Sequence, residues 1–181
     1  MGMRITWLLL FLLALTGPVL TAQEHRPSET REEYESEYQE RIKKETLYGV
    51  YIPQDLTDAF IQLNKLIEAD DRQKFKSLSE EEAEHRLFFS LGRWIIHNWG
   101  FYGGSRLSHF LRELGVYHPE DMARFIIITY HRNLNRKSLD VKPLVESIQE
   151  KRLQEQQEKR KDGQILHEET RVREKTEDQR D

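Results

Sequence analysis

Apolar side chains are concentrated in two parts of the chain, residues 1–22 and residues 48–149. Residues 23–47 and 150–181 are instead rich in Glu, Lys and Arg and carry few apolar side chains. Segments of this composition cannot bury enough apolar surface to fold by themselves. The pattern therefore predicts a core domain at 48–149, preceded by a charged linker at 23–47 and followed by a charged helix or tail at 150–181.

Two helices are predicted in the first half of the core. Pro53 suits a first helical turn, and the charge of Asp55 complements the positive end of a helix. Ser79 with Glu82 three residues later is a capping-box arrangement, and Gly100 is expected to end this second helix. The apolar faces at helical spacing are Leu56, Phe60, Leu63 and Ile67 in the first helix and Ala83, Leu87, Phe88, Leu91, Trp94 and Ile95 in the second.

Three further helices are predicted after Gly100. One begins after Ser105 and stops at Gly115, one begins at Pro119, and the last begins near Asp140 with Pro143 in its first turn. Residues 125–130 also have the composition of a strand. The acidic start and basic end of the segment favour a helix. The expected inward faces are Leu107, Phe110, Leu111 and Leu114, then Met122, Phe125, Ile126, Thr129 and Tyr130, then Leu144, Val145 and Ile148.

These patterns predict an all-α fold, a small orthogonal helical domain of about five helices with charged N- and C-terminal extensions. GVYIPQDL at 49–56 resembles GVYHPEDM at 115–122. The match ends within the first helical turn, whereas structural repeats are similar over ~20–50 residues. We therefore favour two separate helix starts with similar residues over a duplicated structural unit.

The first 22 residues are typical of an export signal. Arg4 provides the positive start, an apolar run follows, and Gly17-Pro18 breaks it shortly before Ala22. The alternative is a retained membrane anchor, but the run barely reaches the ~20 residues that a span needs. We expect a cleaved signal peptide, a mature protein that begins near Gln23, and an exported protein, periplasmic or secreted, that contacts a membrane only through the signal segment.

Composition and spacing exclude several classes of chemistry. The chain has no cysteine, which excludes disulfides, thiol catalysis and cysteine-ligated zinc. A net charge of −4 gives no indication of a nucleic-acid surface. The core histidines form no HExxH motif. We therefore predict no catalytic residue, no cofactor, no metal ligand and no nucleic-acid partner. The histidines in question are His85, His97, His109, His118 and His131.

The stretch WGFYGGSRL at 99–107 is the most plausible ligand site. It lacks the spacing and the lysine of a P-loop. Gly103 and Gly104 can adopt positive φ, and Ser105 can cap the helix that follows. The primary interpretation is a helix-start turn in which Arg106 pairs with a carboxylate of the same chain. The alternative is an anion or ligand site formed by Gly103, Gly104, Ser105 and Arg106, with Trp99 and Tyr102 beside it.

Several separated motifs resemble a bacterial family of domains of unknown function, family 6794. The resemblance covers the core, about residues 48–139, and implies a domain often found in exported proteins; it supplies no activity and no site residues. The motifs are GVYIPQDL at 49–56, LSEEEA at 78–83, LGxW at 91–94, NWG at 98–100, GGSRLS at 103–108 and LGVYHPEDM at 114–122.

We expect an exported, non-enzymatic binding or interaction module whose partner is an unknown protein or a small anionic ligand. Two alternatives stay open: an enzyme or ligand-binding protein with its site at the Gly-Gly-Ser-Arg helix start, and a purely structural spacer. The sequence predicts no oligomeric state. Exposure of the aromatic residues around Arg106 favours ligand binding, whereas their burial together with an ion-paired Arg106 favours a scaffold.

Overall fold

The computed structural model describes residues 30–177, with side chains for residues 30–161. The predicted signal peptide lies outside the described residues. The chain divides into two compact units, Met1–Tyr34 and Glu35–Asp181. All features discussed below lie in the second unit, apart from the first residues of α2.

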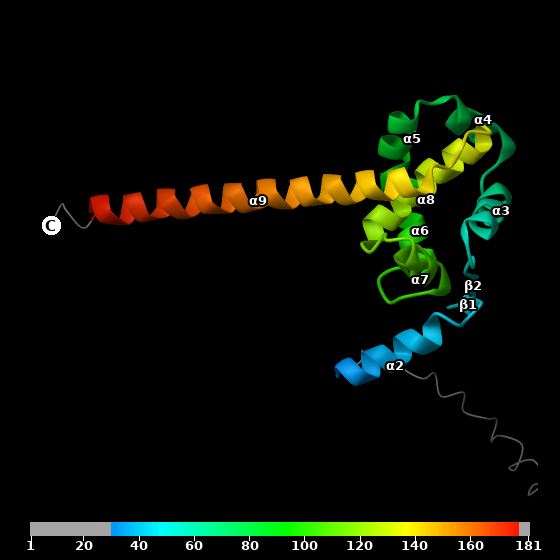
Figure 1. The fold of residues 1–181 in the computed structure, drawn as a ribbon, viewed down its shortest axis with the longest axis horizontal. Coiled ribbons are helices and arrows are strands. Elements are labelled where there is room, and N and C mark those ends of the chain that lie inside the picture. Colours follow the sequence, from blue (N-terminus) through cyan, green and yellow to red (C-terminus); the bar gives the residue numbers. More distant parts are fainter. Residues whose placement is uncertain (1–29, 178–181) are drawn as a thin grey trace, which may run out of the picture. The chain divides into compact units, whose positions relative to one another are not determined.

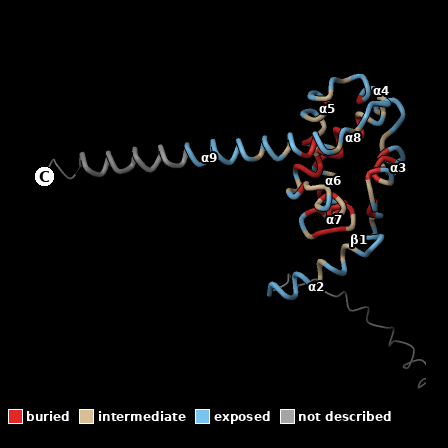
Figure 2. The backbone as a smooth tube through the Cα atoms, viewed as in Figure 1, coloured by how far each residue is buried: buried red, intermediate tan, exposed pale blue. Residues whose placement is uncertain are grey.

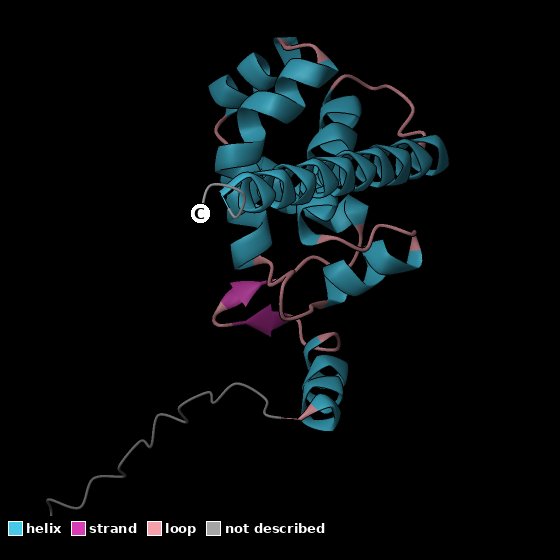
Figure 3. Cartoon of the chain, turned by 90° about the vertical axis from the view of Figure 1, so that its left-hand side faces the viewer, coloured by secondary structure: helices cyan, strands magenta, loops and turns pink. Residues whose placement is uncertain are grey.

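The fold is helical, as predicted, with a single short hairpin in the described part (Figures 1 and 3). In the hairpin, Thr46 pairs with Tyr51 and Leu47 with Val50 in antiparallel register. Among the residues searched, none of the helices is both long and apolar enough to span a membrane. The elements are α2 (Arg31–Arg41), β1 (Thr46–Leu47), β2 (Val50–Tyr51), α3 (Leu56–Leu66), α4 (Ala69–Ser77), α5 (Glu80–Leu87), the π-helix η1 (Phe88–Gly92), α6 (Arg93–Asn98), α7 (Arg106–Glu113), α8 (Pro119–Leu134) and α9 (Val141–Glu177).

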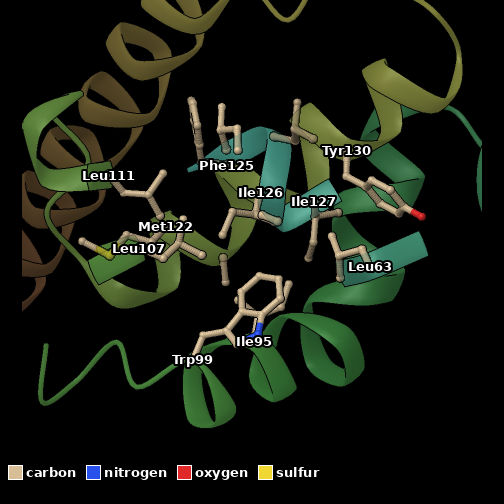
Figure 4. Packing of buried hydrophobic residues seen from close by; sticks show 14 of the residues in the cluster. Leu63, Ile95, Trp99, Leu107, Leu111, Met122, Phe125, Ile126, Ile127 and Tyr130 are labelled. Carbon is tan, nitrogen blue, oxygen red and sulfur yellow. The ribbon is translucent and has the colours of Figure 1, made fainter. Parts of the chain in front are cut away.

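Helix α8 is the centre of the core (Figure 2). It contacts α3, α4, α5, η1, α6, α7 and α9. Its residues 121–131 are buried apart from Arg124, which explains why they lack a clear helical period and have strand-like composition. The strand alternative for residues 125–130 is therefore wrong. Figure 4 shows this packing; the side chains from other helices around α8 are Leu63, Ile95, Trp99, Leu107 and Leu111.

Most predicted helix boundaries are confirmed. Ser79 caps α5 in a reciprocal capping box with Glu82, and Ser105 caps α7. Gly115 has φ +98° after α7, and Pro119 occupies the first turn of α8.

The predicted start of α3 needs correction. The side chain of Asp55 accepts a hydrogen bond from the Asp58 amide and is the N-cap, so α3 begins at Leu56 and Pro53 precedes the helix. The similar segments 49–56 and 115–122 therefore start their helices at different positions, since α8 already begins at Pro119. This difference agrees with reused turn chemistry rather than a duplicated unit.

The long helix predicted after Ser79 is not regular. It consists of α5, η1 and α6, and the π-helical turn shifts the direction of every later side chain. Phe88, on the predicted face at the start of η1, is buried and Phe89 is exposed. Ile96, which lies off the predicted apolar face, is buried, whereas Leu91 and Trp94 on that face are only partly buried.

Three elements were not predicted: the hairpin, α4 and the full helix α2 within the charged segment 23–47. Leu47, which is also in that segment, is buried in the core. The view that 23–47 has no core residue is therefore wrong at Leu47. The domain boundaries themselves stay predictions. Helix α9 starts at Val141, close to the predicted position, and buries Leu144 and Val145.

Candidate functional site

The Gly-Gly-Ser-Arg stretch is a tightly packed turn into α7. Gly104 has φ +86°, in the region that favours glycine. Ser105 and Ser108 are fully buried and cap each other: the Ser105 side chain accepts from the Ser108 amide at 3.3 Å, and the Ser108 side chain accepts from the Ser105 amide at 2.8 Å. Two of the amides that an anion would use at this helix start therefore already have partners.

Arg106 is engaged within the protein. Its Nε donates to the backbone carbonyl of Ile52 at 2.7 Å, and its guanidinium lies 5.0 Å from the centroid of the Tyr51 ring. Its terminal nitrogens lie 3.8 Å from a Glu45 carboxylate oxygen and 4.0 Å from one of Asp58. The pKa of Asp58 is lowered overall: burial raises it, but hydrogen bonds to its carboxylate, including one from Tyr51, outweigh that effect. These contacts agree with the structural interpretation of Arg106.

The aromatic residues of the stretch are divided between core and surface. Trp99 and Phe101 are buried, and Trp99 packs edge to face against Trp94 at 5.9 Å. Tyr102 is 68% exposed. The structure thus brings Gly103, Gly104 and Ser105 together in the turn and turns Tyr102 toward solvent. The anion site at this turn stays a prediction.

Sequence reasoning missed the side chains that cover this turn. Tyr38 and Arg41 of α2 lie against it: Arg41 Nε donates to the Gly104 carbonyl at 3.1 Å, and Tyr38 is hydrogen-bonded to His109 Nδ1 at 3.1 Å. A Cβ on Gly103 would approach the Arg41 guanidinium at 2.9 Å. The spacing of tyrosines in a charged segment gives a helical face, but it does not identify what that face contacts.

A more open site lies one turn away, where η1 and α6 meet α8. We call this hollow the aromatic pocket. Its charged and aromatic lining residues are Phe89, Arg93, His97, Tyr102 and Glu120. Buried Phe88 and Ile96 complete its lining, and its volume is about 340 Å³. Phe89 is 67% exposed, and Tyr102 is exposed to a similar extent. Two large aromatic side chains are thus held in water at one hollow, which is unusual for residues that serve only the core.

The position of Phe89 is fixed by a chain of contacts that reaches α5 and α8. Its ring meets the Phe88 ring edge to face, with centroids 5.4 Å apart. The Arg124 guanidinium lies 4.0 Å from the Phe88 centroid and pairs with Glu84 at 2.5 Å. A Cβ on Gly92 would come within 3.1 Å of Phe88 and 3.3 Å of an Ile127 methyl, so η1 packs closely on α8. The pocket is therefore built on rigid elements.

The charges at the pocket are not matched. Arg93 and His97 are exposed on successive turns, and neither has an ion pair among residues 30–161. Glu120, in the first turn of α8, lines the same hollow without pairing with them. The pocket consequently has an arginine without an ion pair beside two exposed rings.

Residues 52–134 match the family described as "Domain of unknown function (DUF6794)". The match covers 83 of the 181 residues of the chain. Neither the curated proteins nor the solved structures contain a match to the chain. The matched segment includes every residue of the aromatic pocket, whereas α2, the hairpin and α9 fall outside it. The pocket therefore lies entirely within the matched segment.

Two further hollows adjoin the pocket across α8. The first lies between α5, α8 and α9, has a volume of about 170 Å³, and shares Glu120 with the aromatic pocket. The second, of about 510 Å³, lies between the 115–118 loop and α9 and shares Asp121 and Arg152 with the first. Asp121 and Arg152 form a bidentate ion pair that joins α8 to α9. Of the two hollows, only the first shares a lining residue with the aromatic pocket.

No cluster of three or more His, Asp and Glu side chains suited to a metal ion occurs in the part of the chain that was searched. Among the described histidines only His131 is buried; its Nε2 contacts the Leu78 carbonyl at 3.1 Å, and its ring packs against Phe75. The residues that line the aromatic pocket present aromatic surface and charge.

Proposed function

We propose that this protein is an exported binding module that holds a partner at the aromatic pocket. The exposure of Phe89 and Tyr102 at one hollow, beside an unpaired Arg93, carries the proposal. Aromatic side chains and arginine are enriched among the residues that contribute most to protein interfaces. Aromatic side chains bury a large area and lose little side-chain entropy.

A protein partner suits the surface better than a small ligand. The pocket is open and is continued by the two adjoining hollows. Small-molecule sites bury most of their ligand in a single deep cleft. The side chains that could interact directly are held from behind by Phe88, Arg124 and Glu84, so binding would order few groups.

Photo-cross-linking in the cells that produce the protein tests this function. A benzophenone-bearing phenylalanine is placed at position 89, with the same residue at Ile61, a half-exposed apolar position on α3, as the control. We expect a discrete adduct from position 89 that is lost when Tyr102→Ala is added. Identical adducts from positions 89 and 61, or an adduct that survives Tyr102→Ala, would contradict a partner site at the pocket.

Export is the second part of the proposal, and it rests on the apolar segment that precedes Gln23. Mass spectrometry of the protein recovered from outside the cytoplasm tests it. We expect an N-terminus near Gln23; recovery of the chain with Met1 intact and only inside the cells would contradict export.

A further inference from the structure

We propose that the aromatic pocket binds a peptide segment in which an apolar ring lies next to a carboxylate. The inference rests on the proposed function and specifies the chemistry of the partner. The ring would lie between Phe89 and Tyr102, and the carboxylate would pair with Arg93.

The volume and lining of the pocket favour a single ring. About 340 Å³ is at the small end of ligand sites and accommodates one large side chain. Phe89 and Tyr102 present aromatic surface to this space, and buried Phe88 and Ile96 keep its inner wall apolar. Aromatic rings pair favourably in offset or edge-to-face arrangements, which gives an aromatic side chain an advantage over an aliphatic one.

The charges determine where the carboxylate lies. Arg93 follows Phe89 by four residues, and both line the pocket. Its guanidinium has no carboxylate partner in the described side chains, unlike Arg124 and Arg132, which pair with Glu84 and Glu80. A guanidinium can bind a carboxylate through two parallel hydrogen bonds.

Glu120 limits how a ligand can be oriented. It lines the pocket from α8, so a carboxylate placed beside it would be repelled. A ligand with a carboxylate is therefore oriented with that group toward Arg93 and His97.

Titration of the ¹⁵N-labelled mature chain by NMR spectroscopy tests the inference with two probes that differ only in charge. N-acetyl-tryptophan has a ring and a carboxylate, whereas N-acetyl-tryptophanamide has the ring alone. We expect saturable shifts at Phe89, Arg93 and Tyr102 with both probes, and about threefold tighter binding of the carboxylate, as suits a partly exposed ion pair.

Variants assign the difference to Arg93. Arg93→Gln should reduce the affinity for N-acetyl-tryptophan to that for the amide and leave the amide unaffected. Arg86→Gln removes the same charge from an exposed position outside the pocket and should preserve the difference. Retained chemical shifts elsewhere show that each variant is folded.

The outcomes separate this inference from the proposed function. Equal affinities for the two probes in the wild-type protein would show that the carboxylate does not contribute to binding. The pocket would then bind the ring alone. If neither probe shifts the pocket resonances, the inference is wrong, and cross-linking from position 89 still decides the proposed function. A preference for the carboxylate that persists in Arg93→Gln would also overturn the role of Arg93.

Discussion

The ring of Tyr38 packs directly on Gly104, so that a Cβ at position 104 would clash with the ring. Tyr38 lies on α2, in the charged segment outside the matched DUF6794 residues, and Gly104 lies in the turn before α7. The contact shows that α2 packs on the turn with the most glycine residues. It also makes Gly104 subject to two separate constraints, positive φ and close packing.

Gly104→Ala should destabilise the protein more than Gly49→Ala. Both glycines have positive φ, +86° and +79°, which costs an L-residue about 1–2 kcal/mol. Only Gly104 has a side chain in the way, since nothing lies within 4 Å of a Cβ on Gly49. Chemical denaturation measures both losses. Adding Tyr38→Ala should recover part of the Gly104→Ala loss; equal losses at the two glycines would show that Tyr38 does not pack there in solution.

Arg106→Ala should lower the free energy of unfolding by about 1–3 kcal/mol, because it removes a charge-assisted hydrogen bond to the Ile52 carbonyl. Phosphate or sulfate at constant ionic strength should give no saturable stabilisation of either protein. Thermal melts with and without the anion measure both effects. Saturable protection of the wild type alone would instead support an anion site at the turn.

Ser105→Ala should lower the free energy of unfolding more than Ser79→Ala, although both serines are N-caps with a capping box. An exposed cap such as Ser79 contributes ~1 kcal/mol. Ser105 is fully buried, so its loss also leaves the Ser108 amide unsatisfied away from water. Urea unfolding of the two single variants gives the comparison, and a larger loss for Ser79→Ala would contradict the burial of the α7 start.

Several helix boundaries could be predicted from the sequence because they depend on local chemistry, although the start of α3 was placed too early. Ser79, Ser105, Gly115 and Pro119 each specify a boundary through their own hydrogen bonds or backbone angles. The fold class and the inward residues of α8 followed from the same reasoning. Local patterns do not contain the π-helical turn at Phe88–Gly92, which depends on how η1 packs on α8.

The aromatic pocket could not be predicted for that reason. A regular helix from Ser79 places Phe89 away from the predicted apolar face without indicating whether it meets solvent or protein. Tyr102 was a candidate, but its neighbours in space, Phe89, Arg93 and Glu120, come from two other elements. The contact of Tyr38 with Gly104 was missed because a charged segment gives no signal of what it covers.

Acid should weaken the α5–α8 connection through Glu80. A hydrogen bond from Arg132 holds the pKa of Glu80 below its ordinary value of 4.5, with donor distances of 2.8 and 2.6 Å. A carboxylate with a lowered pKa stabilises the fold fully above pH 4.5, and this contribution disappears as the pH falls through the folded-state pKa. Glu80→Gln should therefore be less stable at neutral pH and lose less stability than the wild type below pH 4.5.

Glu81→Gln is the matched control, because the neighbouring Glu81 is exposed and has no ion pair among the described side chains. It should follow the wild-type dependence of unfolding free energy on pH. Parallel curves for wild type and Glu80→Gln below pH 4.5 would show that the Arg132 pair does not form.

The central claim is that Phe88 serves the core while Phe89 is left for a partner. The free energies of unfolding of Phe88→Ala and Phe89→Ala test it most directly. Phe88 is 7% exposed, so Phe88→Ala should lower the free energy of unfolding by about 3–5 kcal/mol. Phe89 is 67% exposed, so Phe89→Ala should lower it by no more than about 1 kcal/mol, the size of the ring contact with Phe88. Losses of equal size would contradict the account, because Phe89 would then serve the fold rather than a partner.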